Sequence, residues 1–152
     1  MTAGHADITI LLAEDDDGHT ELILEQLRSV GVANKIIRFH NGRELWDYLT
    51  AEGQRTCPPS GRDLLLILDI VMPKMDGLEA LQRIKTDQRW HNLPIIMLTT
   101  TNDPREIENC YKLGCNCCIT KPIAYERFAE TLKKLGFCLM VTPAPVIPSQ
   151  DG

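Results

Sequence analysis

The stretch Leu64-Leu65-Leu66-Ile67-Leu68-Asp69 decides the fold, because five consecutive aliphatic residues run directly into a carboxylate. A run that no polar residue interrupts is typical of a strand covered on both faces, as parallel sheets require. We therefore predict a central strand over residues 64–69. The same pattern predicts a second buried strand over residues 94–99, which ends at the hydroxyl of Thr99.

Short apolar runs alternate with amphipathic segments of helical length along the whole chain, five times in all. The expected strands cover residues 8–13, 35–39, 64–69, 94–99 and 117–120, and the expected helices cover residues 19–30, 41–52, 78–87, 104–114 and 125–135. Leu22 and Tyr111 are expected to face the core. Repeated strand–helix units favour a doubly wound α/β fold, a five-stranded parallel sheet between two layers of helices.

Length and charge exclude several classes of function. The 152 residues fit one globular domain, and 16 basic against 21 acidic residues give a net charge of -5. Such a chain is repelled on average by nucleic acid and by anionic lipid, so neither nucleic acid nor membrane is expected as a partner. No apolar run approaches the length of a membrane span, and no secretory signal is recognisable, so we expect a cytoplasmic protein.

The six cysteines do not indicate a disulfide framework in a cytoplasmic chain. They are Cys57, Cys110, Cys115, Cys117, Cys118 and Cys138. The spacing of Cys115 and Cys118 matches C-x-x-C, but Cys117 and Cys118 would point to opposite faces of a strand and could not easily share a metal. Buried free thiols are the favoured interpretation.

Chemically active side chains stand where the predicted strands end. Glu14 and Asp15 follow the first strand, Asp69 ends the third, Thr99 ends the fourth, and Lys121 follows the fifth. Because open α/β sheets bind ligands at the carboxyl ends of their strands, we expect these five side chains to share one pocket.

Three carboxylates in one pocket require compensating positive charge. Mg²⁺ prefers oxygen ligands and takes one or two carboxylates together with phosphate oxygens, and Lys121 adds a mobile ammonium. The pattern indicates phosphoryl transfer to a carboxylate, with Asp69 as the nucleophile and with Thr99 donating to the transferred group. Asp16 or Asp17 is expected to cap the following helix, and His19 and His40 are expected to be solvated.

Four motifs resemble the receiver domain of two-component response regulators. They are LLAEDDDGH, LLLILDIVMPKMDG, LPIIMLTTT and ITKP, and Asp15, Asp69, Thr99 and Lys121 lie 54, 30 and 22 residues apart. The resemblance implies that Asp69 is the phosphoacceptor, that Glu14 and Asp15 bind Mg²⁺, that Thr99 is the switch hydroxyl and that Lys121 is the family's lysine. It also implies the flavodoxin-like strand order 2-1-3-4-5.

The resemblance covers about residues 7–136. It implies a receiver domain over residues 1–136, followed by an apolar stub and a proline-rich tail over residues 137–152. The carbonyl of Val71 would complete the metal shell. One departure is Cys118, three residues before Lys121, where the family usually has Tyr or Phe.

The resemblance also implies partners. A sensor histidine kinase would supply the phosphoryl group, and output by protein contact, without an output domain, would make the chain a signalling protein rather than an enzyme. The loop over residues 53–63 and the extension FCLMVTPAP resemble small receivers paired with bacterial phytochrome kinases. A histidine phosphotransfer protein and a homodimer through residues 137–141 are further expected partners.

Other functions with a similar layered order fit less well. A flavodoxin-type protein needs a phosphate loop after the first strand, where residues 14–17 are acidic. A haloacid dehalogenase-like phosphatase needs a second acid at the position of Val71. Neither G-x-x-x-x-G-K-[ST] nor G-x-G-x-x-G occurs, which disfavours nucleotide enzymes. The alternative that stays open is a receiver-like interaction module that is never phosphorylated.

Overall fold

The computed structural model describes residues 9–29, 32, 34–54, 64–121, 126–127 and 130. Its elements are β1 (Thr9–Ala13), α2 (Asp17–Ser29), β2 (Ile36–Phe39), α3 (Gly42–Gln54), β3 (Leu64–Asp69), α4 (Gly77–Lys85), β4 (Ile95–Thr99), α5 (Pro104–Leu113) and β5 (Cys117–Thr120). All five predicted strands and the first four predicted helices are confirmed. The helix predicted over residues 125–135 lies mostly outside the described residues, as do residues 137–152.

The five strands form one parallel sheet in the order β2-β1-β3-β4-β5, which confirms the predicted flavodoxin-like fold. In the register of the central strand, Leu66 of β3 lies between Leu11 of β1 and Ile95 of β4. All six residues of β3 are buried, because this strand has neighbours on both edges and helices on both faces.

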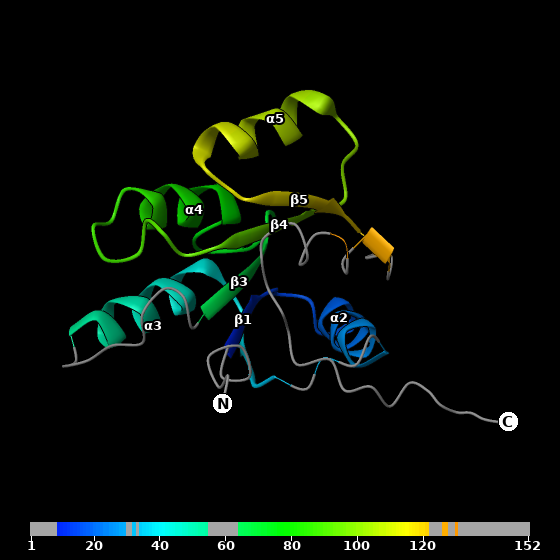
Figure 1. Cartoon of the computed structure of the whole chain (residues 1–152), viewed down its shortest axis with the longest axis horizontal. Helices are drawn as coiled ribbons and strands as arrows, with labels where there is room; N and C mark the ends of the chain where they lie inside the picture. The colour runs from blue at the N-terminus through cyan, green and yellow to red at the C-terminus, as the bar shows by residue number, and fades with distance from the viewer. Residues whose placement is uncertain are drawn as a thin grey trace, which may run out of the picture.

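The helices divide between the two faces of the sheet (Figure 1). On one face, Ile23 and Leu27 of α2 pack with alternate residues of the strands, such as Ile10 and Ile67. On the other face, α3, α4 and α5 pack against the intervening residues. No helix in the described part of the chain combines the length and the apolar character that crossing a bilayer demands.

Two predictions about helix orientation are wrong. Leu22 is 43% exposed, because the buried side of α2 runs through Thr20, Ile23 and Leu27. Tyr111 of α5 is 44% exposed, and its hydroxyl instead accepts a hydrogen bond from the backbone N–H of Cys118 at 3.1 Å. Leu22 and Tyr111 both lie beside the buried stripe of their helix, and helical spacing alone did not separate them from it.

The helices begin with side-chain caps that hold the loops at the carboxyl ends of the strands. Each capping side chain accepts a hydrogen bond from a backbone N–H in the first turn of the next helix, at 2.8 to 3.0 Å. The four caps are Asp16, Asn41, Asp76 and Asp103. After β3 the chain also approaches itself closely at Gly77, where a Cβ atom would collide with the carbonyl oxygen of Asp69. A glycine is therefore required beneath Asp69.

Candidate functional site

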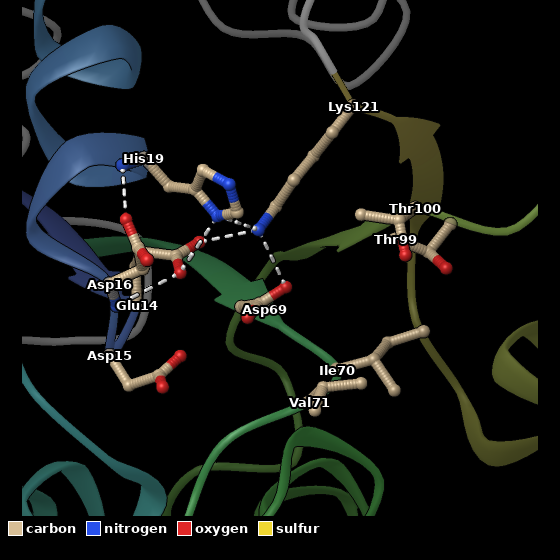
Figure 2. A pocket seen from close by; sticks show the side chains of 10 residues that line it. All are labelled: Glu14, Asp15, Asp16, His19, Asp69, Ile70, Val71, Thr99, Thr100 and Lys121. Atoms are coloured by element: carbon tan, nitrogen blue, oxygen red, sulfur yellow. Dashed lines mark hydrogen bonds and ion pairs between the residues drawn. The ribbon is translucent and has the colours of Figure 1, made fainter.

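The parallel strands deliver polar side chains to a single pocket of about 210 Å³ (Figure 2). Its lining residues are Glu14, Asp15, Asp16, His19, Asp69, Ile70, Val71, Thr99, Thr100 and Lys121. All six predicted site residues are among them. The structure thus brings these residues together, while their functional roles remain predictions.

The turn from β1 to α2 places the acidic pair. Asp16 caps α2, as predicted: its Oδ1 accepts from the N–H of His19 at 2.8 Å, and this bond lowers the pKa of Asp16. Glu14 points into the protein and is fully buried, whereas Asp15 is exposed. The two neighbouring acids therefore meet the pocket in different environments.

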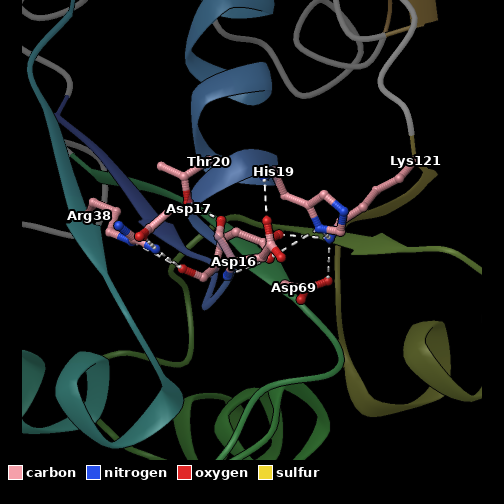
Figure 3. A network of polar contacts seen from close by, with 8 residues as sticks. Asp16, Asp17, His19, Thr20, Arg38, Asp69 and Lys121 are labelled. Atoms are coloured by element: carbon pink, nitrogen blue, oxygen red, sulfur yellow. Dashed lines mark hydrogen bonds and ion pairs between the residues drawn. The ribbon is translucent and has the colours of Figure 1, made fainter.

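Arg38 of β2 holds the turn between β1 and α2 from the side opposite Lys121 (Figure 3). Its Nε and Nη2 donate to the carbonyl oxygen of Glu14 at 3.0 and 2.9 Å, and Nη2 lies 3.0 Å from Oδ1 of Asp17. A planar guanidinium bonded twice to one carbonyl restrains the backbone at Glu14. The sequence analysis did not identify Arg38, which is 24 residues from Glu14.

Lys121 connects the first and third strands of the chain. Its Nζ donates to Oε1 of Glu14 at 2.7 Å and lies 3.0 Å from Oδ1 of Asp69. Burial alone would lower the pKa of this ammonium, but the two carboxylates outweigh burial and raise the pKa above its ordinary value. Lys121 is therefore a fixed positive charge between two buried acids.

Asp69 ends β3 with only 5% of its surface exposed. Burial raises its pKa from 3.8 to about 6; the bond from Lys121 opposes this rise, and the negative charge of Glu14 adds to it. Asp69 is consequently a mostly ionised carboxylate at neutral pH whose charge is only partly compensated by the protein. Such a group attracts a cation and can act as a nucleophile.

Three carboxylates form the group that could hold a metal ion. Glu14, Asp15 and Asp69 each offer an oxygen atom, and these atoms lie within 4.8 Å of one another. An all-oxygen, multiply negative donor set suits a hard divalent cation such as Mg²⁺ or Mn²⁺. The donor chemistry of the pocket therefore fits the predicted metal, and no second such group occurs among the residues that the structure describes.

Thr99 and Val71 complete the opposite wall of the pocket. Thr99 is 4% exposed, and its Oγ1 accepts from the N–H of Thr101 at 3.0 Å. The hydroxyl proton of Thr99 is therefore available for an acceptor in the pocket. Val71 is 74% exposed at the rim. Its predicted metal contact through the carbonyl oxygen stays a prediction.

His19 is one of the pocket residues that the sequence analysis missed. It was expected in solvent, but its Nδ1 lies 3.2 Å from Nζ of Lys121 and 3.5 Å from Oε2 of Glu14, and half of its side chain is exposed. The sequence offered one signal for His19, which is the capping residue Asp16. A cap at Asp16 starts α2 at Asp17 rather than at residue 19. An earlier start puts His19 in the first helical turn, directly above the acids.

The cysteines of α5 and β5 lie apart from this pocket. Cys110, Cys115 and Cys118 are buried, and Cys117 is half-buried. Burial raises the pKa of both Cys115 and Cys118 to about 12. Cys110, Cys115 and Cys118 are buried free thiols, as predicted, whereas Cys57 and Cys138 lie outside the described residues.

Comparison with known proteins agrees with this geometry. The model of the response regulator receiver domain family matches residues 10–133. Among curated proteins, the response regulator Rcp1 of Synechocystis sp. is 31% identical over 112 residues, which cover 74% of this chain and 75% of that protein. A solved structure titled as the Mn²⁺-bound form of Rcp1 is similar, with a TM-score of 0.68, 26% identity and coverage of 93% and 99% of the two chains.

Two further solved structures are similar over nearly their whole length. A response regulator receiver domain from Rhodospirillum rubrum is 38% identical, with a TM-score of 0.70 and coverage of 95% of this chain and 100% of that one. The bacteriophytochrome response regulator AtBRR is 30% identical, with a TM-score of 0.74 and coverage of 94% and 98%.

Proposed function

Because the chain belongs to the response regulator receiver domain family, we propose that it accepts a phosphoryl group on Asp69 from a sensor histidine kinase. The observation that carries this proposal is the Asp69 carboxylate, buried at the end of β3 within 3.0 Å of the Lys121 ammonium and beside two further acids. Receiver domains are signalling proteins, and output here would pass through protein contacts.

The transfer step uses Asp69 as the nucleophile. A carboxylate oxygen attacks phosphorus, an O–P bond forms, and the P–N bond of the donor phosphohistidine breaks. The electron pair of that bond remains on the imidazole of the kinase, which takes up a proton. With a pKa of about 6, Asp69 is ionised at neutral pH and needs no general base.

Lys121 and Thr99 then stabilise the negative charge of the phosphoryl group on Asp69. A phosphoryl group adds about -1.5 to -2 charges. The Lys121 ammonium can exchange a carboxylate partner for a phosphoryl oxygen, and the Thr99 hydroxyl can donate to another. The Thr99 hydroxyl is also bonded to the loop before α5, because its Oγ1 accepts a hydrogen bond from the backbone N–H of Thr101. Phosphorylation would therefore reach α5 through this loop.

Mg²⁺ is the metal we propose for the acid pair, with Glu14, Asp15, Asp69 and the carbonyl of Val71 as its ligands. When bound, the ion neutralises charge on the transferring group. The three carboxylate oxygens within 4.8 Å of one another support this assignment, as does the Mn²⁺-bound title of the Rcp1 structure.

The kinase is proposed to be a bacteriophytochrome or a close relative. Similarity to AtBRR, a bacteriophytochrome response regulator by its title, supports this partner. Onward transfer of the phosphoryl group from Asp69 to a histidine phosphotransfer protein is also proposed. A homodimer stabilised by residues 137–141 is also proposed, and truncation after Gly136 should then weaken self-association in sedimentation.

The competing function is a receiver-like module that binds partners without ever being phosphorylated. Acetyl phosphate with Mg²⁺ separates the two functions. The wild-type chain and the Asp69→Asn and Asp47→Asn variants are incubated with both reagents, and their intact masses are measured. Asp47 is an exposed acid on α3 and serves as the matched control.

We expect the wild type and Asp47→Asn to gain one phosphoryl group, and Asp69→Asn to gain none. A wild type that gains no phosphoryl group would favour the interaction module. Labelling of Asp69→Asn would assign phosphorylation to another residue.

A further inference from the structure

His19 lies at the start of α2, where its backbone N–H is hydrogen-bonded and its ring lines the pocket. The N–H of His19 donates to Oδ1 of Asp16, the residue that caps the helix, at 2.8 Å. Half of the side chain is exposed, and the ring belongs to neither of the two apolar clusters of the described residues. The ring makes two polar contacts in the pocket: its Nδ1 lies 3.2 Å from Nζ of Lys121 and 3.5 Å from Oε2 of Glu14.

The ring completes the hydrogen bonding of Lys121. An ammonium has three N–H donors. In Lys121 they face Oε1 of Glu14 at 2.7 Å, Oδ1 of Asp69 at 3.0 Å and Nδ1 of His19 at 3.2 Å (Figure 2). For Nδ1 to accept, the ring must be the neutral tautomer with its proton on Nε2.

The three partners of Lys121 differ in the other tasks they have. In the proposed function Glu14 binds the metal and Asp69 becomes an acyl phosphate. Both carboxylates then have another partner that competes with the Lys121 ammonium. His19 has neither task, and its imidazole is the one partner among the three that is not a carboxylate. It can hold Lys121 throughout the reaction.

We propose that His19 is a positioning residue, which keeps the Lys121 ammonium directed into the pocket while the carboxylates exchange partners. The inference rests on the proposed phosphoryl transfer and adds to it a residue whose contact is made through Lys121. Without the ring, a long and flexible side chain would have to be ordered again at each transfer. The effect should appear in the rate of transfer and not in metal affinity.

The first test compares His19→Ala, His19→Asn and His40→Ala with the wild type. Asparagine keeps an acceptor near the position of Nδ1, whereas alanine removes it. His40 is an exposed histidine whose Nδ1 contacts Glu44, so its replacement is the matched control. The phosphorylation rate is measured with saturating acetyl phosphate and Mg²⁺, and the Kd of Mg²⁺ is measured separately by titration.

We expect His19→Ala to slow phosphorylation by about 3- to 10-fold, the effect of losing one ordinary hydrogen bond at a half-exposed side chain. His19→Asn should restore the rate to within about twofold of the wild type, and His40→Ala should leave it unchanged. The Kd of Mg²⁺ should stay the same in all variants. A rate in His19→Ala equal to that of the wild type would overturn the inference, and so would His19→Asn that is as slow as His19→Ala.

The second test needs no phosphoryl transfer. The ammonium protons of Lys121 are observed by nitrogen-edited NMR in metal-free protein, where three bonded donors should exchange slowly with water. His19→Ala should broaden or abolish this signal, while His19→Asn and His40→Ala should retain it. An unchanged signal in His19→Ala would contradict the contact.

The two tests distinguish failure of the inference from failure of the proposed function. A wild type that acetyl phosphate never labels defeats the proposed function, and the metal-free spectrum alone then decides whether His19 holds Lys121. A labelled wild type with an unaffected His19→Ala variant leaves the proposed function intact and removes His19 from it.

Discussion

The acidic pocket and the α5–β5 contact both bury polar groups, but they do so in opposite ways. In the pocket, the buried carboxylates of Glu14 and Asp69 both form ion pairs with the ammonium of Lys121. Between α5 and β5, the buried polar groups are the thiols of Cys110, Cys115 and Cys118, here called the thiol cluster. The pocket buries charge that needs compensation, whereas the thiol cluster buries neutral groups that need none.

The difference appears in the pKa values. Burial raises the pKa of Asp69 to about 6, which still leaves it ionised at neutral pH. Burial raises the pKa of Cys115 and Cys118 to about 12, so these thiols stay protonated over the whole physiological range. A pocket that keeps an unfavourable charge is ready for a cation or a phosphoryl group, and the thiol cluster is inert.

The largest expected effect follows from removing the cation of the pocket. Lys121→Met leaves Glu14 and Asp69 buried without the ammonium that lies between them, and should lower the free energy of unfolding by about 3 kcal/mol in metal-free protein at pH 7.5. The loss should shrink as the pH falls below 6, because Asp69 then becomes protonated. Urea unfolding measures this change.

Lys112→Met is the control, since Lys112 is exposed at the end of α5 and its replacement should change the free energy of unfolding by less than about 0.5 kcal/mol. Equal losses in the two variants would mean that the pocket carries no uncompensated charge.

A smaller effect of opposite sign is expected when the buried acid itself is removed. The native pKa of Asp69 is about 6 against an ordinary value of 3.8, so the native state binds more protons than the unfolded state between these two pH values. Stability from this group is thus lost as the pH rises from about 4 to about 6, and the loss is complete above that range.

Asp69→Asn should therefore stabilise the metal-free chain by about 1–3 kcal/mol at pH 7.5, with a gain that disappears toward pH 4. Thermal unfolding at several pH values checks this. A gain that is the same at pH 4.5 and 7.5 would contradict the raised pKa.

The thiol cluster should respond without any dependence on pH. Cys118 is buried in the same apolar cluster as Cys110. Cys118→Ser places a more polar hydroxyl in this site and should destabilise the protein by about 1–2 kcal/mol. Because no group of the thiol cluster titrates between pH 6 and 8, the loss should be equal at both values. A loss that changes across this range would mean that the thiol cluster carries charge.

The smallest effect concerns the edge of the sheet beside the thiol cluster. The hydroxyl of Tyr111 accepts from the N–H of Cys118 at 3.1 Å, on the outer side of β5. Tyr111→Phe removes this acceptor and should lower stability by about 0.5–1.5 kcal/mol. Hydrogen exchange should become faster at the Cys118 amide while that of Leu66, in the central strand, is unchanged. Equal exchange of Cys118 in both proteins would show that the bond does not persist.

Strand ends could be predicted from the sequence because an apolar run that stops at a polar residue marks both the strand and the edge where ligands bind. Glu14, Asp69, Thr99 and Lys121 all follow this rule. His19 could not, because its contact joins α2 to Lys121, which lies 102 residues further along the chain.

Contacts between distant residues were also beyond local patterns. Arg38 bonds the carbonyl of Glu14 from β2, and Tyr111 reaches across to β5, although helical spacing favoured an inward position for it. Each contact depends on where the end of a long side chain lies after the sheet has formed. Periodicity places a Cα atom on a face, but it does not place a guanidinium or a phenol.

The most direct test of the central claim identifies the phosphorylated atom. The chain is incubated with acetyl phosphate and Mg²⁺, treated with borohydride, which reduces an aspartyl phosphate to homoserine, and mapped by peptide mass spectrometry. We predict homoserine at position 69 and unmodified aspartate at positions 15, 16 and 17. Homoserine at any of those three positions, or unmodified Asp69 in a chain whose intact mass shows a phosphoryl group, would contradict the account.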